Sequence, residues 1–85
     1  MDEAATFEAV RDVVVTTLGI EERTAALDRD TVLLGGLPEL DSMAVLEVVE
    51  ALESRFGFEI DDTELTGEVF ETLGSLTQFV ADKAA

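Results

Sequence analysis

Apolar residues recur every three or four positions in three stretches of the chain, as expected for α-helices that bury one face. The first stretch covers residues 2–18, the second residues 42–56 and the third residues 72–83. Gly19 and Gly57 directly follow the first two stretches, and glycine in this position commonly ends a helix. We therefore predict three long helices. Their apolar stripes consist of Phe7, Val10, Val14 and Leu18, of Val45, Val49, Leu52 and Phe56, and of Leu73, Leu76, Phe79 and Val80.

Two connecting segments complete the predicted fold. Residues 20–40 lose the periodicity and mix turn-forming residues with leucines, which predicts a long loop that covers the core and contains a short helical turn. Residues 61–66 predict a short helix, capped by Asp61 or Asp62. A chain of 85 residues is long enough for one domain and too short for two. We therefore expect residues 1–85 to form one all-α domain, a small four-helix bundle with three longer helices, one short helix and a long loop between helices 1 and 2.

The chain is strongly acidic, because five Lys and Arg residues oppose 20 Asp and Glu residues and give a formal net charge of -15. Nucleic acid and anionic lipid are bound through Lys and Arg, so the charge balance argues against both as partners. It favours basic protein surfaces, although acidity also serves solubility alone. No apolar run approaches the roughly 20 residues of a membrane span, and the acidic start does not resemble a secretory signal. We expect a cytoplasmic monomer.

The chain lacks the side chains on which most catalytic and metal sites depend. It contains no His, Cys, Trp or Tyr, and Lys83 is its only lysine. A serine nucleophile needs a neighbouring base, most often His, and zinc sites need Cys or His. The acidic residues 59–64 lack the spacing and the glycine of a calcium loop, so a solvated surface is the favoured interpretation. We therefore predict no catalytic residue and no metal site, in a protein that is not an enzyme.

The Asp41-Ser42 pair stands where the long loop meets the second predicted helix. Asp and Ser are both favoured at the start of a helix, so the pair alone predicts a cap. Residues 34–43 read Leu-Gly-Gly-Leu-Pro-Glu-Leu-Asp-Ser-Met, and a mixture of apolar and acidic residues follows. Together with the helix order, the length and the acidity, this segment resembles the acyl carrier protein family. The resemblance covers most of the chain, with Glu39 in place of a common glycine and Met43 in place of a common leucine.

In that family, a serine that follows aspartate at the start of the second helix receives 4′-phosphopantetheine from coenzyme A. The resemblance implies that Ser42 carries this arm and that acyl thioesters are presented on it to enzymes of fatty acid, polyketide or related biosynthesis. A helix start suits the role, because a phosphate there meets unsatisfied N–H groups and the positive end of the dipole. We expect Asp41 to act both as N-cap and as ligand of the Mg²⁺ ion that a phosphopantetheinyl transferase uses during loading.

Met43, Glu47 and Glu50 share the outward side of the second predicted helix, close to Ser42. We predict that they dock the transferase and the acyl-transferring or acyl-activating enzymes, whose basic patches would meet the two glutamates. Met43 would be the apolar anchor. The simpler interpretation of the same residues is a solvated helix surface.

Two other functions are open at this point. One is a peptidyl or D-alanyl carrier protein, whose cargo is an amino acid. The strong acidity of the chain favours acyl cargo instead. An acidic helical adaptor, phosphorylated on Ser42, belongs to a different class. No basic or proline-directed residue flanks Ser42, which argues against the adaptor. A pantetheine-sized mass gain on Ser42 separates the carrier from the adaptor.

Overall fold

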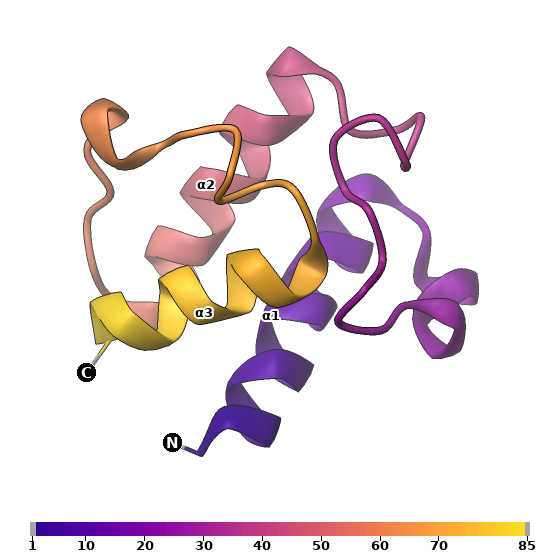
Figure 1. Ribbon diagram of the computed structural model, residues 1–85, viewed down its shortest axis with the longest axis horizontal. Coiled ribbons are helices and arrows are strands. Elements are labelled where there is room, and N and C mark those ends of the chain that lie inside the picture. Colours follow the sequence, from indigo (N-terminus) through magenta and orange to yellow (C-terminus); the bar gives the residue numbers. More distant parts are fainter. Residues whose placement is uncertain (1, 85) are drawn as a thin grey trace.

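The structure is a computed structural model that describes residues 2–84. It contains three α-helices, α1 (Glu3–Leu18), α2 (Ser42–Phe56) and α3 (Leu73–Ala84) (Figure 1). Two short 3₁₀-helices, η1 (Glu21–Ala26) and η2 (Asp62–Glu64), lie in the connecting segments. The predicted all-α fold is confirmed. The predicted short helix is the single turn η2, and the turn expected inside the long loop is η1.

The helices begin and end where local chemistry favours it. Asp2 caps α1 and Asp41 caps α2, each accepting a hydrogen bond from the backbone N–H three residues later. Gly19 and Gly57 follow α1 and α2 in the left-handed conformation, with φ of 70° and 73°. Such a φ is unfavourable for other residues because of the clash that a Cβ would cause. The predicted ends of both helices are therefore confirmed.

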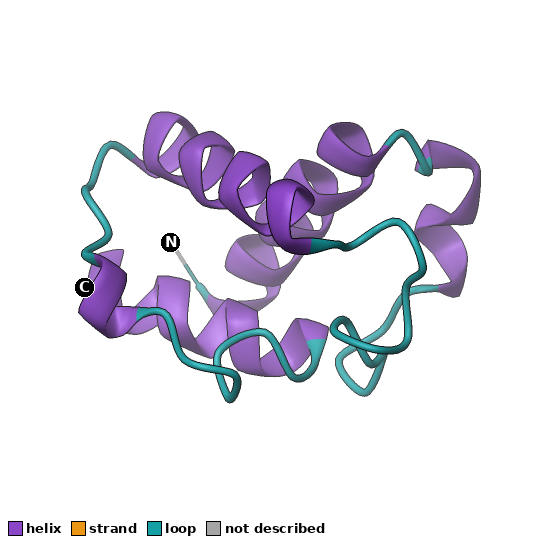
Figure 2. Cartoon of the chain, turned by 90° about the horizontal axis from the view of Figure 1, so that it is seen from above, coloured by secondary structure: helices purple, strands orange, loops and turns teal. Residues whose placement is uncertain are grey.

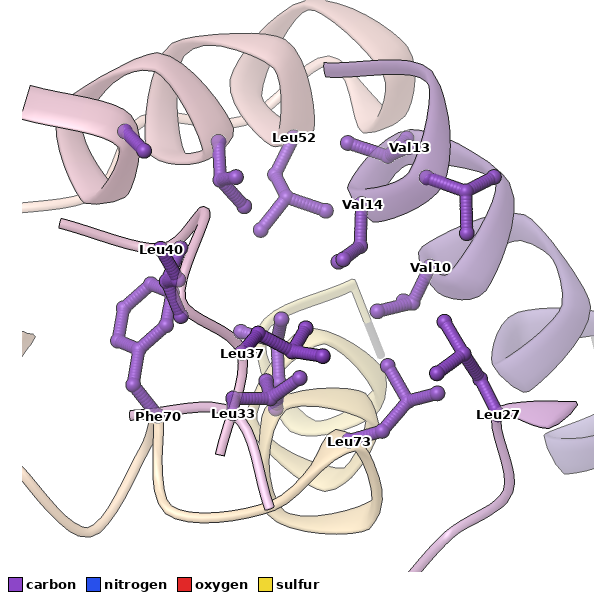
Figure 3. Packing of buried hydrophobic residues seen from close by; sticks show 14 of the residues in the cluster. Val10, Val13, Val14, Leu27, Leu33, Leu37, Leu40, Leu52, Phe70 and Leu73 are labelled. Atoms are coloured by element: carbon purple, nitrogen blue, oxygen red, sulfur yellow. The ribbon is translucent and has the colours of Figure 1, made fainter. Parts of the chain in front are cut away.

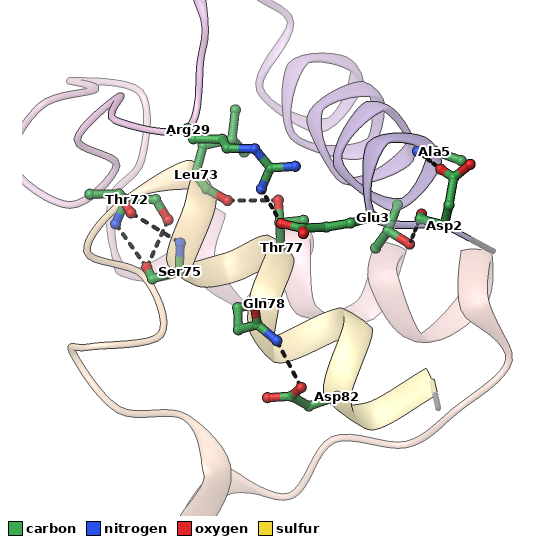
Figure 4. A network of polar contacts seen from close by, with 11 residues as sticks. Asp2, Glu3, Ala5, Arg29, Thr72, Leu73, Ser75, Thr77, Gln78 and Asp82 are labelled. Atoms are coloured by element: carbon green, nitrogen blue, oxygen red, sulfur yellow. Dashed lines mark hydrogen bonds and ion pairs between the residues drawn. The ribbon is translucent and has the colours of Figure 1, made fainter.

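The start of α3 is closed by a reciprocal pair of hydrogen bonds. The N–H of Ser75 donates to the hydroxyl of Thr72, and the N–H of Thr72 donates to the hydroxyl of Ser75, both at 3.0 Å (Figure 4). This arrangement satisfies two N–H groups at the helix entry. One turn further, the buried hydroxyl of Thr77 donates to the carbonyl of Leu73 at 2.8 Å, so this polar group in the core has a partner.

Helix α1 packs against both α2 and α3, while the connecting segments run along the outside of the helices (Figure 2). Loop side chains point into the space bounded by the three helices and fill it together with residues of α1, α2 and α3 (Figure 3). The loop residues that contribute are Ile20, Leu27, Leu33, Leu37, Leu40 and Phe70. The long loop is therefore part of the core, as its leucines predicted.

The buried stripe of α2 differs in part from the prediction. Val49 and Leu52 are buried as expected, but Val48 is also buried, whereas Val45 and Phe56 are only partly covered. Val48 faces inward because α2 is covered from two directions, by α1 and by the loop leucines, which widens the apolar stripe.

A short backbone ladder fastens the long loop to the entry of α3. Four backbone hydrogen bonds of 2.9–3.1 Å join residues 29–34 to residues 70–74, around an isolated antiparallel bridge between Val32 and Thr72. We call this feature the loop ladder. It gives the loop partners for its backbone groups and holds it against α3.

A tight turn at Gly35 and Gly36 leads the loop from the ladder toward α2. Gly35 has a φ of 84°, and a Cβ on Gly36 would lie 2.2 Å from the carbonyl oxygen of Val32. Because only glycine tolerates these positions, the chain can fold back on itself here. Both Leu33 and Leu37, on either side of the turn, are thereby buried.

Candidate functional site

Ser42 is the first residue of α2 and its side chain is exposed, as is that of Asp41. Burial fixes the chain around this pair, because Leu40 directly before it and Ala44 two residues after it lie in the core. The serine hydroxyl is therefore attached to a backbone held from both sides, while it faces solvent. Both positions agree with the sequence-based prediction.

Asp41 organises the start of α2. Its carboxylate accepts a hydrogen bond from the N–H of Ala44 at 2.8 Å, and its carbonyl accepts one from the N–H of Val45 at 2.9 Å. Within residues 2–84, the N–H groups of Ser42 and Met43 have no acceptor. Two donors at the positive end of the helix dipole thus lie beside the Ser42 hydroxyl, a setting that fits a phosphate group attached to that oxygen.

No base in the described chain activates Ser42. The hydroxyl makes no hydrogen bond within residues 2–84, and the neighbouring Asp41 carboxylate is engaged with the helix N–H. Because a serine nucleophile requires a base in hydrogen-bond contact, the arrangement favours a serine modified by another protein over one that catalyses a reaction itself.

Close to Ser42, α2 exposes Met43, Leu46, Glu47 and Glu50, which we call the exposed face of α2. Met43 is 72% exposed and Leu46 is 57% exposed, so this face presents two large apolar side chains to solvent. The structure thus groups the three predicted docking residues and adds Leu46, which the sequence analysis missed. The helical spacing could have identified Leu46. It lies three residues after Met43, and on a helix this places the two side chains only about 60° apart around the axis.

Glu39, two residues before Asp41, forms an ion pair with Arg23 of η1. The pKa of the Glu39 carboxyl is lowered from its ordinary value of 4.5, first by the nearby N–H of its own backbone and then by the Arg23 guanidinium. The carboxylate is therefore the favoured form at neutral pH. The segment that enters the site is tied to η1 by this pair.

Across residues 2–84, no three His, Cys, Asp or Glu side chains are grouped so that they would hold a metal ion. In the same part of the chain, none of the helices combines the length and the apolar character that crossing a bilayer requires.

Comparison with known proteins gives a consistent result. Residues 8–80 match the family described as "Phosphopantetheine attachment site". The acyl carrier protein of Campylobacter hominis is 43% identical over 58 residues, which cover 68% of this chain and 70% of the relative. The acyl carrier protein of Campylobacter concisus is 42% identical over 60 residues, which cover 71% and 74% of the two chains.

A solved structure agrees with these relatives. The solution NMR structure of a holo acyl carrier protein from Nitrosomonas europaea shares 51% sequence identity with this chain and superimposes with a TM-score of 0.84. The match covers 91% of this chain and 93% of the other.

The fold and these matches define the class as a small all-α carrier protein, and the matching relatives are carrier proteins, not enzymes. The chain belongs to the acyl carrier protein family. Its cofactor is accordingly 4′-phosphopantetheine, bound covalently. Family membership also implies interaction with a phosphopantetheinyl transferase and with acyl-handling enzymes.

Proposed function

We propose that Ser42 is the attachment residue for 4′-phosphopantetheine and that the chain carries acyl intermediates of fatty acid, polyketide or related biosynthesis. The observation that supports this most directly is the exposed Ser42 hydroxyl at the open N-terminal end of α2, beside two N–H groups that have no acceptor in residues 2–84. These groups would donate to the attached phosphate and stabilise its charge.

The loading step needs a base that this chain does not provide. The Ser42 oxygen would attack the phosphorus of coenzyme A that bears the pantetheine, form the new phosphodiester and displace the nucleotide part. Because the hydroxyl has no base within residues 2–84, its proton must be taken by the transferase. We infer that the chain supplies position and access, and that the transferase supplies the chemistry.

Asp41 has a second role in this proposal. Its carboxylate caps α2, and it is also exposed next to Ser42. A Mg²⁺ ion held by the transferase would gain a ligand from Asp41 while it neutralises the diphosphate of coenzyme A. This use resolves the repulsion that a carboxylate would otherwise exert on an incoming phosphate.

We further propose that the exposed face of α2 docks partner enzymes. Met43 and Leu46 provide an apolar centre, and Glu47 and Glu50 provide negative charge beside it. Basic surfaces complement such charges and speed up association, while buried apolar anchors provide most of the affinity. In this proposal residues 1–85 act as one carrier domain, which works as a monomer in the cytoplasm.

Intact mass spectrometry tests the attachment residue. The purified apo-protein is incubated with coenzyme A, Mg²⁺ and a broad-specificity phosphopantetheinyl transferase, and the expected result is a mass gain of one phosphopantetheine. The Ser42→Ala variant should gain no mass, because it lacks the acceptor oxygen. The Ser75→Ala variant is the matched control at the start of α3 and should be loaded like the wild type.

Two results would contradict the proposal. If the wild-type protein gains no mass, Ser42 does not carry the arm. If the Ser42→Ala variant is loaded, the arm is attached to another residue. Incubation of the loaded protein with acyl and with aminoacyl donors then separates an acyl carrier from an aminoacyl carrier.

A further inference from the structure

We propose that Arg23 and Glu39 form a positioning pair that holds the segment entering α2 in the orientation needed for loading of Ser42. This inference rests on the proposed function of Ser42. It assigns a role to an ion pair outside the attachment site and outside the exposed face of α2.

The pair connects parts of the chain that are distant in sequence. Arg23 lies in η1, directly after α1, and its Nη2 donates to Oε2 of Glu39, 16 residues further along. The long loop spans the residues between them and forms one end of the molecule (Figure 1). The ion pair therefore closes the loop at its two ends, next to η1 and next to α2.

Burial alone fixes only part of the geometry of the entering segment. Leu37 and Leu40 anchor it in the core, but apolar contacts have no preferred direction. A hydrogen bond between a guanidinium and a carboxylate is directional and charge-assisted, so it restricts rotation of the segment about its buried anchors. Glu39 lies between these two leucines and provides such a bond.

Loss of Arg23 would force the segment to move. One carboxylate oxygen of Glu39, Oε1, is buried without a hydrogen-bond partner in the described chain, and the other is bonded to Arg23. A partly buried carboxylate without its cation must regain water contacts. Because the carbonyl of Glu39 accepts the N–H of Asp41 at 3.2 Å, any such movement is passed on to the cap of α2 and to Ser42.

The kinetics of loading distinguish positioning from docking. A residue that orients Ser42 affects the reaction of the bound protein, and therefore kcat, whereas a residue that contacts the transferase affects KM. We expect the Glu39→Gln variant to lower kcat for loading by about fivefold and to leave KM unchanged. This is well short of the roughly hundredfold loss that a misplacement of about 1 Å can cause. The Arg23→Gln variant should show the same change.

Two control variants separate the pair from general charge effects. Glu3→Gln removes the same charge and breaks the exposed Arg29–Glu3 ion pair, which Figure 4 shows beside the start of α1, so it should load at the wild-type rate. The Arg23→Glu/Glu39→Arg double variant restores an ion pair with reversed polarity and should recover most of the lost kcat. Amide hydrogen exchange at Asp41 should be faster in Glu39→Gln and return toward the wild-type rate in the double variant.

Three results would overturn the inference: a wild-type kcat in Glu39→Gln, an equal loss in Glu3→Gln, or no recovery in a folded double variant. If Glu39→Gln does not fold, the test depends on the Arg23→Glu/Glu39→Arg variant alone, because its loading rate shows whether a restored ion pair is sufficient for loading. A wild-type protein that is not loaded at all contradicts the proposed function itself and the pair's role with it. Normal wild-type loading with an unaffected Glu39→Gln variant contradicts only the positioning pair.

Discussion

Asp41 combines a structural task with a proposed task in loading, and the two can be separated by a single substitution. Asn is as good an N-cap as Asp, so Asp41→Asn should retain the hydrogen bond to Ala44 and the stability of α2. It removes the negative charge that would bind Mg²⁺, so we expect loading of Ser42 to slow by at least about tenfold. Thermal unfolding and intact mass measured over time provide the two readouts.

Asp2→Asn is the matched control for this substitution. Asp2 caps α1 in the same way, with its carboxylate 2.7 Å from the N–H of Ala5, but it belongs to a different helix from Ser42. Both variants should unfold at nearly the wild-type temperature, and only Asp41→Asn should load slowly. Equal loading rates in the two variants would leave Asp41 with a capping role alone.

At the level of single residues, the sequence predicts positions that depend on local chemistry. Asp41 and Ser42 could be placed at a helix start because capping preferences involve only the next few residues. The partner of Glu39 could not be predicted, because Arg23 is 16 residues away and the contact depends on how the loop folds. Leu46 was not among the predicted docking residues, although the helical spacing places it within about 60° of Met43.

At the level of the elements, charge reversal tests whether the exposed face of α2 docks partner enzymes. We expect the Glu47→Lys/Glu50→Lys variant to reduce kcat/KM for loading at low salt by about tenfold, because electrostatic attraction speeds up encounter. The difference should shrink as salt screens the charges. The Glu8→Lys/Asp12→Lys variant carries the same charge change on exposed positions of α1 and should have the smaller effect. Equal effects would indicate that net charge alone matters.

A second prediction at this level concerns the contribution of the loop ladder to stability. Gly74 lies in the first turn of α3, and a Cβ there would lie 2.8 Å from the carbonyl oxygen of Arg29. Although Ala is the better helix former by about 1 kcal/mol, we expect Gly74→Ala to destabilise the protein, because overpacking costs about 1–3 kcal/mol. Denaturant unfolding gives the free energy of unfolding.

Gly67→Ala is the control, since a Cβ at Gly67 meets no atom within 4 Å and its φ lies outside the left-handed region. This variant should be neutral or more stable by about 0.4–1 kcal/mol. If the Gly74→Ala protein is as stable as Gly67→Ala, the backbone of the loop ladder can move away from the added Cβ at little cost in free energy.

The order and type of the long helices could be predicted because each has its own apolar period and end signals. The loop ladder could not be predicted, since residues 29–34 and 70–74 meet only after the helices have packed. The same holds for the length of η2, because a three-residue turn has no periodicity of its own. Local pattern therefore sufficed for α1, α2 and α3, and tertiary contacts decided the connections.

At the level of the whole molecule, the basic side chains are held against the protein's own surface. Each has an acidic or aromatic neighbour, and these contacts are Arg23 with Glu39, Arg29 with Glu3, Lys83 with Glu64, Arg11 with Phe7 and Arg55 with Phe56. The 20 acidic residues exceed the five basic ones by fifteen, so most of the negative charge is not balanced by basic side chains of this chain. The molecule as a whole therefore attracts basic partners and repels itself.

The Lys83–Glu64 ion pair joins η2 to the end of α3 and links the stability of the fold to pH. Both carboxylate oxygens of Glu64 lie 2.9 Å from Nζ of Lys83. The pKa of Glu64 is lowered from its ordinary value of 4.5, first by the Lys83 ammonium and then by the N–H of Asp61. A lowered pKa in the folded state means that the pair stabilises the fold above the ordinary value and loses this effect as pH falls through the folded-state pKa.

Glu64→Gln should therefore have a lower denaturant midpoint than the wild type at pH 7, by a small amount because the pair is partly exposed. The difference should begin to shrink below pH 4.5, the ordinary pKa that applies to the unfolded chain, and should be lost as the pH falls through the lowered pKa of folded Glu64. Glu59→Gln removes the same charge from an exposed position and should be neutral or stabilising at pH 7, because it relieves repulsion. Protonation of the other carboxylates also relieves repulsion as pH falls, so the difference between variants is the informative quantity. A Glu64→Gln deficit that stayed constant from pH 7 to pH 3 would show that packing around Glu64, and not its charge, stabilises the junction of η2 with α3.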